Sequence, residues 1–393
     1  MVGPMGTIRS VETRHCDAGW RDYHFLRITT DEGVVGWSEY DENLGGTGLT
    51  AVIEEFAPMV EGEPVDAVER VRARLVAEAR QTLTGVTAMA IGAVENALLD
   101  AKAKGLGVPC VDLLGGAIRE EIPVYWSHCG TYRINQSEYY DSVRDLADVR
   151  ALGEEVRDSQ FGALKTNIFD FRGEEPTGWV PGFGRPFHPE LTIEDDQLAA
   201  QRTYLEALRE GAGPETDILL DLNYNMKPEG YIRLVRELAD FDLFWVEIDT
   251  PDATPLADVR RASPHTIASC EALVPHEAFV PYLREGATDV VIIDALWNGV
   301  LQTTKIASMA DAHQHHVAPH NYYGHLATFM NAHWAAAVPN LRIMEVDIDR
   351  LPWDDELFTE TPEYRDGNLQ LPDGPGWGCE PDEAALEEHP PQH

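Results

Sequence analysis

A repeating order of short apolar runs and amphipathic stretches is the feature that most limits how this chain can fold. From Ile122 onward, eight strand-like runs alternate with seven helical patterns. Such alternation is typical of parallel strands joined by crossover helices. The predicted strands are 122–127, 163–168, 217–222, 243–248, 266–271, 289–294, 315–319 and 342–346, and the helical patterns lie around 137–157, 194–210, 228–239, 254–262, 275–285, 299–313 and 325–338.

This order predicts an α/β fold, a (β/α)7β barrel of the TIM type over residues 122–350. The competing open, doubly wound sheet usually carries a glycine-rich phosphate loop after its first strand, and Tyr-Trp-Ser-His-Cys-Gly stands there instead. Residues 1–121 predict three antiparallel strands followed by helices, an α+β domain. We expect residues 351–393 to return to that domain, with a Pro-, Gly- and Glu-rich tail from 371 that is partly disordered.

Three carboxylates in the second half of the chain each end an apolar run. They are Asp221, Glu247 and Glu271, separated by 26 and 24 residues, the length of one strand and one helix with their loops. A barrel brings the tips of its strands to one face. A single acid at such a place is more often the cap of the next helix, but three in succession predict oxygen ligands around one Mg²⁺ ion.

Other predicted strands also end in polar residues. Residues i and i+2 of a strand face the same way, so Lys165 and Asn167 are expected to point together into the barrel mouth. Asp221 and Asn223 form a second such pair, and Glu345 lies on the eighth strand. These residue types are those expected for a metal site surrounded by polar groups that bind a ligand.

Asp294 ends the sixth predicted strand, and His320 follows the seventh. At adjacent tips, the carboxylate could accept a hydrogen bond from one imidazole nitrogen and make the other nitrogen more basic. The nearby His313, His315 and His316 have no Cys/His partners at zinc spacing, so we expect them at the surface.

Composition excludes several kinds of protein. Acidic residues outnumber basic ones by 68 to 30 and are spread along the chain, so the net charge of −38 argues against nucleic-acid or anionic-membrane partners. The same charge predicts a cell with high internal salt, where ions screen the self-repulsion. Five scattered cysteines without a Cys-x-x-Cys pair predict no disulfide framework. With no signal pattern and no run of about 18 apolar residues, we expect a cytoplasmic protein.

Taken together, the strand ends resemble the mandelate racemase group of the enolase superfamily. The order Lys-x-Asn, Asp-x-Asn, Glu, Glu, Asp, His, Glu on successive strands matches that group, and the resemblance covers nearly the whole chain. Further similar segments are residues 31–39, 96–116, 267–271 (Ile-Ala-Ser-Cys-Glu) and 317–321 (Val-Ala-Pro-His-Asn). The resemblance implies an N-terminal capping domain, Mg²⁺ held by the three carboxylates, removal of a proton next to a substrate carboxylate, and a homo-oligomer.

It also implies roles for single residues. His320 with Asp294 would be the base, Lys165 would neutralise the enolate, and Asn223 and Glu345 would bind the substrate carboxylate. Many relatives carry a second lysine where this chain has Asn167, whose amide cannot take a proton at neutral pH.

One competent base suits elimination of water from a sugar acid. The resemblance therefore implies a dehydratase of an aldonate or aldarate that forms a 2-keto-3-deoxy sugar acid. An epimerase, racemase or lactone cycloisomerase would use the same enolate, and a non-catalytic binding or regulatory member would keep the metal site alone.

The proton donor for the departing hydroxyl stays open at this point. Some dehydratases of the group have a histidine where this chain has Asn223. Either His320 performs both transfers on one face, or His128, Tyr132 or His188 supplies the proton. His128 is otherwise a candidate substrate-binding residue. We expect the loops at 40–49 and 171–191 to set specificity, the second as a lid.

Overall fold

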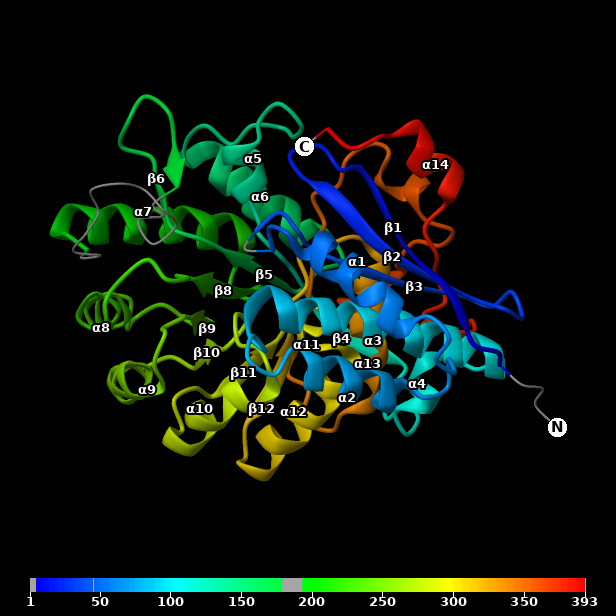
Figure 1. Cartoon of the computed structure of the whole chain (residues 1–393). Coiled ribbons are helices and arrows are strands. Elements are labelled where there is room, and N and C mark those ends of the chain that lie inside the picture. Colours follow the sequence, from blue (N-terminus) through cyan, green and yellow to red (C-terminus); the bar gives the residue numbers. More distant parts are fainter. Residues whose placement is uncertain (1–4, 45, 179–192, 393) are drawn as a thin grey trace.

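The computed structural model describes residues 5–44, 46–178 and 193–392 and begins with a three-stranded antiparallel sheet in the order β1-β2-β3. Its strands are β1 (Ile8–Asp17), β2 (Asp22–Thr30) and β3 (Val35–Tyr40). Four helices follow, as Figure 1 shows: α1 (Leu49–Val60), α2 (Val68–Glu78), α3 (Gly85–Leu106) and α4 (Cys110–Leu113). The α+β arrangement predicted for this part of the chain is confirmed.

Helix α3 is buried over most of its length because it lies between the N-terminal sheet and the barrel. Small residues permit this close packing. A Cβ atom on Gly92 would lie 2.8 Å from the carbonyl oxygen of Trp297 in α11 (Ala295–Asn298), and one on Gly36 of β3 would lie 2.2 Å from that of Ala97. A side chain at Gly92 would force α3 away from the barrel, and one at Gly36 would force β3 away from α3.

Eight parallel strands form the second unit. Each pairs with its neighbour in the order β13-β4-β5-β8-β9-β10-β11-β12. Between β12 and β13 the link is a single bridge, Val317 to Leu341. The strands are β4 (Glu121–Trp126), β5 (Ala163–Thr166), β8 (Asp217–Asp221), β9 (Leu243–Glu247), β10 (Ile267–Ser269), β11 (Val290–Ile293), β12 (His316–Pro319) and β13 (Met344–Val346).

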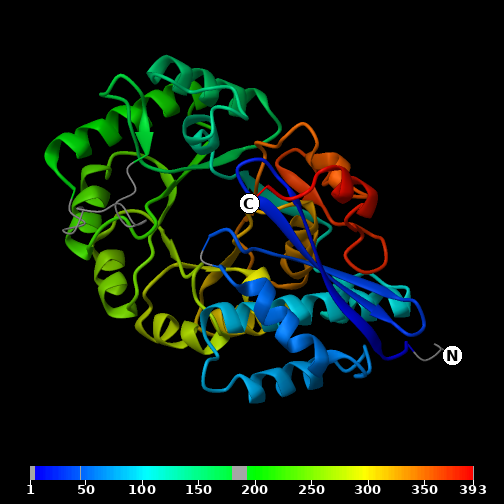
Figure 2. The same ribbon diagram turned by 45° about the horizontal axis from the view of Figure 1, so that its top comes forward.

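Seven helices alternate with these strands and form the outer ring seen in Figure 2. The predicted (β/α)7β order is confirmed. Helix α6 begins later than expected, because Asp145 accepts hydrogen bonds from the backbone N–H groups of Ala147 and Asp148 and caps the helix there. The ring helices are α6 (Leu146–Asp158), α7 (Asp195–Ala212), α8 (Pro228–Glu237), α9 (Ala253–Ala262), α10 (Phe279–Glu285), α12 (Val300–Ala312) and α13 (His325–Ala337). Within the described ranges, no helix is long and apolar enough to cross a membrane.

An apolar layer inside the barrel supports the polar residues at its mouth. Leu219, Trp245 and Tyr125 belong to this layer, and the rings of Trp245 and Tyr125 meet edge to face at 5.7 Å. Side chains two residues further along a strand point the same way. Asp221 and Glu247 therefore stand directly above Leu219 and Trp245, at the carboxyl end of their strands.

Two buried carboxylates join the capping domain to the barrel. Glu39 of β3 accepts hydrogen bonds from the backbone N–H of Gly324, which precedes α13, and of Ala327. Glu95 of α3 does the same for Leu301 and Gln302 in the first turn of α12. Helix N-termini attract negative charge, but burial still raises the pKa of both glutamates to about 7.

The C-terminal segment packs against the capping domain. After β14 (Tyr364–Arg365), β15 (Asn368–Gln370) pairs with β4, and α14 (Glu383–Glu388) contacts β1. Trp377 is fully buried and donates from Nε1 to the carbonyl oxygen of Trp37 at 2.8 Å. Partial disorder was predicted for this tail from its composition; its buried tryptophan adds apolar contact that the polar composition did not indicate.

Glu95→Leu should lower the free energy of unfolding by about 3–5 kcal/mol, because it leaves Arg72 and the N–H groups of α12 without their buried partner. Chemical denaturation with urea measures this. Arg365→Ala, which removes an exposed ion pair with Glu363, is the control and should cost less than about 1 kcal/mol. Equal losses for both variants would contradict the role given to Glu95.

Candidate active site

Asp221, Glu247 and Glu271 come together at the carboxyl ends of neighbouring strands. Asp221 ends β8 and is paired in register with Glu247, which ends β9. Glu271 follows β10, and its carboxyl is one of the neighbouring groups that affect the pKa of Glu247. Burial, helped by the charge of Asp221, raises the pKa of Glu247 to about 7, and burial with neighbouring acids raises the pKa of Glu271 well above its usual value.

Lys165 compensates part of this negative charge. Its ammonium lies 3.4 Å from Asp221, 3.2 Å from Glu247 and 2.9 Å from Glu345. Burial alone would lower the pKa of Lys165, but Glu247 and Glu345 raise it well above its usual value. The lysine is therefore charged, and one positive charge faces several acids.

A fourth carboxylate, Asp249, is two residues beyond Glu247 and was missed from the sequence. It accepts hydrogen bonds from the Ser269 hydroxyl and the Cys270 N–H, both at 3.2 Å. Its Oδ2 is buried and has no hydrogen-bond partner among the described residues. The strand period of two residues is the signal that could have identified it, because i and i+2 share a face.

The chemistry of this donor set fits a divalent cation. Within the described ranges, no three Asp, Glu, His or Cys side chains already form a metal-binding cluster; Lys165 pairs with the carboxylates instead. Even so, the site gathers hard oxygen donors, leaves an Asp249 oxygen unpartnered, and crowds carboxyl groups whose raised pKa values a cation would lower. These features fit Mg²⁺. Asp221, Glu247 and Glu271 are the residues that would hold the ion.

His320 lies across the mouth from Lys165 and is held by Asp294. Nδ1 of His320 is 2.7 Å from Asp294 Oδ2, and the same oxygen accepts from the Tyr323 hydroxyl at 2.5 Å. The other Asp294 oxygen accepts from the N–H of Trp297. Because the carboxylate can only accept, Nδ1 carries the proton and Nε2 is the free base.

Burial alone would lower the pKa of His320, but the hydrogen bond to Asp294 raises it above its usual value. Nε2 stands 3.5 Å from Glu271, on the side of the carboxylate cluster. Tyr323 was not identified from the sequence, because its contact with Asp294 joins two different loops.

The remaining predicted residues also lie here. Asn167 donates weakly to the carbonyl of Asp221 and to Asn223 Oδ1, both at 3.4 Å, and accepts from the Thr131 hydroxyl at 2.8 Å. Glu345 is buried, and although burial would raise the pKa of its carboxyl, the Lys165 ammonium lowers it far below the usual value. Glu345 is therefore ionised.

A cavity of about 500 Å³ opens above these groups. Its walls include His128 and Tyr132 after β4, and Trp20 and Leu44 from the capping domain. Seven predicted site residues line it: Lys165, Asn167, Asp221, Asn223, Glu271, His320 and His128. Three others contact this lining from beneath: Glu247, Asp294 and Glu345. The segment 171–191 was predicted as a lid, but most of it and His188 lie outside the described residues.

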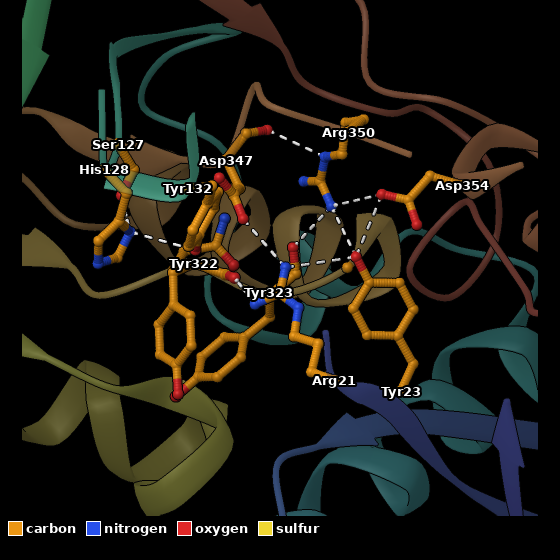
Figure 3. A network of polar contacts seen from close by, with 12 residues as sticks. Arg21, Tyr23, Ser127, His128, Tyr132, Tyr322, Tyr323, Asp347, Arg350 and Asp354 are labelled. Atoms are coloured by element: carbon orange, nitrogen blue, oxygen red, sulfur yellow. Dashed lines mark hydrogen bonds and ion pairs between the residues drawn. The ribbon is translucent and has the colours of Figure 1, made fainter. Parts of the chain in front are cut away.

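Arg21 fixes the capping domain at this mouth (Figure 3). Its guanidinium donates to Asp347 Oδ2 at 3.0 Å and to the carbonyl of Tyr322 at 2.5 Å. It also lies 4.7 Å from the ring centre of Trp20, which lines the cavity. No local pattern marks Arg21, because Tyr322 and Asp347 are more than 300 residues away along the chain. Trp20 packs against the ring of Tyr132, which is also far away in sequence.

Comparison with known proteins agrees with this geometry. A D-xylonate dehydratase of Haloferax volcanii is 28% identical over 99% of this chain and 91% of its own length, and a D-galactonate dehydratase family member of Streptomyces bingchenggensis is 30% identical over 94% and 90%. A solved structure from Burkholderia xenovorans strain LB400, described as an L-alanine-DL-glutamate epimerase, has a TM-score of 0.97 at 55% identity and covers 98% of both chains. A second structure of it, covering 98% of this chain and 96% of that one, is bound to magnesium and fumarate.

Two family models divide the chain between them. Residues 7–115 match the N-terminal domain of mandelate racemase and muconate lactonizing enzyme, and residues 148–385 match the enolase C-terminal domain-like family. The chain therefore belongs to the mandelate racemase and muconate lactonizing enzyme family of the enolase superfamily.

Proposed function

We propose that this protein is a Mg²⁺-dependent dehydratase of a sugar acid, an aldonate or aldarate, with a 2-keto-3-deoxy sugar acid as product. One observation carries the proposal. A single base, His320 backed by Asp294, faces the carboxylate cluster, while the second lysine of many relatives is replaced by Asn167. Relatives named as D-xylonate and D-galactonate dehydratases support the substrate class.

Proton removal begins the reaction. Nε2 of His320 takes the proton from the carbon next to the substrate carboxylate, and the electron pair of the broken C–H bond moves into that carboxylate. Lys165 supplies positive charge where the negative charge develops. A bound divalent cation would add Lewis-acid stabilisation of the same charge. Asp221, Glu247 and Glu271 would hold it. A structure of the 55%-identical relative is bound to magnesium and fumarate, which supports the choice of cation.

Elimination completes the reaction. The electron pair returns to form a C2=C3 double bond while the bond from C3 to its hydroxyl breaks. The protonated His320 gives its proton to this hydroxyl, which leaves as water, so both transfers occur on one face. The enol that remains rearranges to the 2-keto acid.

An epimerase is the second candidate, favoured by the description of the Burkholderia relative. Inversion of a carbon centre needs proton donors or acceptors on both faces. Asn167 holds a neutral amide and accepts from Thr131, so it cannot take a proton at neutral pH. This residue argues for dehydration. The family resemblance also leads us to propose a homo-oligomer acting on a small-molecule substrate.

Aldonates and aldarates incubated with the protein and Mg²⁺ should yield a 2-keto acid, detected with semicarbazide. Because the net charge is −38, the screen should run at low and at molar KCl. In D₂O, an epimerase would instead exchange the substrate α-hydrogen without forming a keto acid. Such exchange would show epimerisation in place of dehydration. If no aldonate or aldarate reacts, the result would favour a protein that binds a ligand without catalysis.

His320→Asn should lower kcat by about 10²- to 10⁴-fold, because the α-proton loses its acceptor. The matched control is His313→Asn, a change at an exposed histidine of the outer ring, which should leave kcat unchanged. Full activity of the His320 variant would contradict the assignment of the base.

Asp221→Asn should weaken Mg²⁺ binding at least about tenfold, measured by titration calorimetry, because it removes one anionic oxygen ligand. Asp258→Asn, at an exposed acid of α9, is the control for the loss of one negative charge. If both variants bind Mg²⁺ as tightly as the original protein, the ion is held elsewhere.

A further inference from the structure

The hydrogen bonds beside His128 determine which of its ring nitrogens carries the proton. Ser127 Oγ lies 2.6 Å from Glu345 Oε1 and 2.8 Å from His128 Nδ1. Glu345 is ionised beside Lys165 and also accepts from the N–H of Asn321. A carboxylate oxygen and a hydroxyl oxygen at 2.6 Å need a proton between them, so the only hydroxyl proton of Ser127 points to Glu345.

Ser127 therefore has no proton left for His128. The contact at 2.8 Å then requires Nδ1 of His128 to donate to the serine oxygen. The Tyr132 hydroxyl lies 3.4 Å from the same nitrogen and can accept a second, weaker hydrogen bond from it. In a neutral ring, a proton on Nδ1 leaves Nε2 as an acceptor only.

The surroundings keep the imidazole neutral and in place. The His128 side chain is half-buried, and its desolvation lowers its pKa to about 3; the charge of Glu345 opposes this shift and that of Lys165 adds to it. Its ring stacks on Tyr132 at 5.3 Å and meets Tyr322 edge to face at 5.7 Å. Its backbone has a φ of 48°, a conformation that is uncommon for a non-glycine residue and often found at functional sites.

We infer that His128 is a specificity residue whose Nε2 accepts a hydrogen bond from one hydroxyl of the substrate. The ring lines the cavity together with Lys165 and His320, and Figure 3 shows Nδ1 turned to Ser127 and Tyr132 with the other nitrogen pointing away from both. An unprotonated acceptor selects a hydroxyl and repels a carbonyl or a carboxylate. This inference rests on the proposed function, because a sugar acid supplies such hydroxyls.

The same tautomer changes the choice of proton donor for elimination. Nε2 has no proton to give, and the Nδ1 proton is bound to Ser127 on the side away from the cavity. His128 therefore does not protonate the departing hydroxyl, one of the roles considered for it from the sequence. Of the donors considered from the sequence, His320, Tyr132 and His188 remain, and His320 faces the carboxylate cluster.

The first test determines the tautomer of His128 by NMR and needs no substrate. In protein labelled with ¹⁵N-histidine, the ring signal that disappears in His128→Asn belongs to His128. We expect a neutral ring with the proton on Nδ1 at pH 7, and a shift toward a mixture of tautomers in Ser127→Ala. A proton on Nε2, or a charged ring, would overturn the inference whether or not the protein turns out to be a dehydratase.

The second test measures which substrate hydroxyl His128 binds. D-Gluconate, D-galactonate and D-xylonate would be compared with their monodeoxy analogues. For one hydroxyl position, the original protein should lose about 10- to 100-fold in kcat/KM, the usual cost of an unpaired buried polar group. His128→Asn keeps a partner for Ser127 but has no nitrogen at the Nε2 position, so it should lose little at that same position. Equal losses of kcat/KM in the original protein and in His128→Asn would overturn the inference. If neither protein turns over any of the acids, the tautomer found in the first test decides whether the inference holds.

Discussion

Several buried acids around one buried ammonium are the interaction on which the rest of this structure depends. Removing charges from water costs several kcal/mol for each ion unless partners are close, and Lys165 reaches Asp221, Glu247 and Glu345 within 3.4 Å. The carboxyl ends of the parallel barrel strands bring these residues together from distant parts of the chain. The apolar layer beneath them keeps the cluster at the mouth of the barrel.

The capping domain completes this mouth and is joined to the barrel by charge as well as by apolar packing. Glu39 and Glu95 bind the first turns of two outer helices, and Arg21 binds loops that follow β12 and β13. Trp20 thereby covers part of the cavity. The polar groups that would meet a substrate come from the barrel, and the capping domain limits the space around them.

The barrel and most of the site could be predicted from sequence because both follow local rules. Apolar runs mark strands, and polar residues at their ends mark the mouth, so Asp221, Glu247 and His320 stand out. Contacts across the chain have no such signal: Arg21 and the packing of Trp377 depend on residues far away in sequence. The proton position on His128 required the distances around Ser127, which no pattern contains.

The proposed mechanism depends on a catalytic cation that the strand-end carboxylates bind opposite His320. A crystal of the protein grown with Mn²⁺ in place of Mg²⁺ would test it directly through anomalous scattering. We predict one strong peak in contact with carboxylate oxygens of Asp221, Glu247 and Glu271, at about 2.0–2.2 Å. A protein that leaves Lys165 between those carboxylates and binds Mn²⁺ only elsewhere would contradict the account.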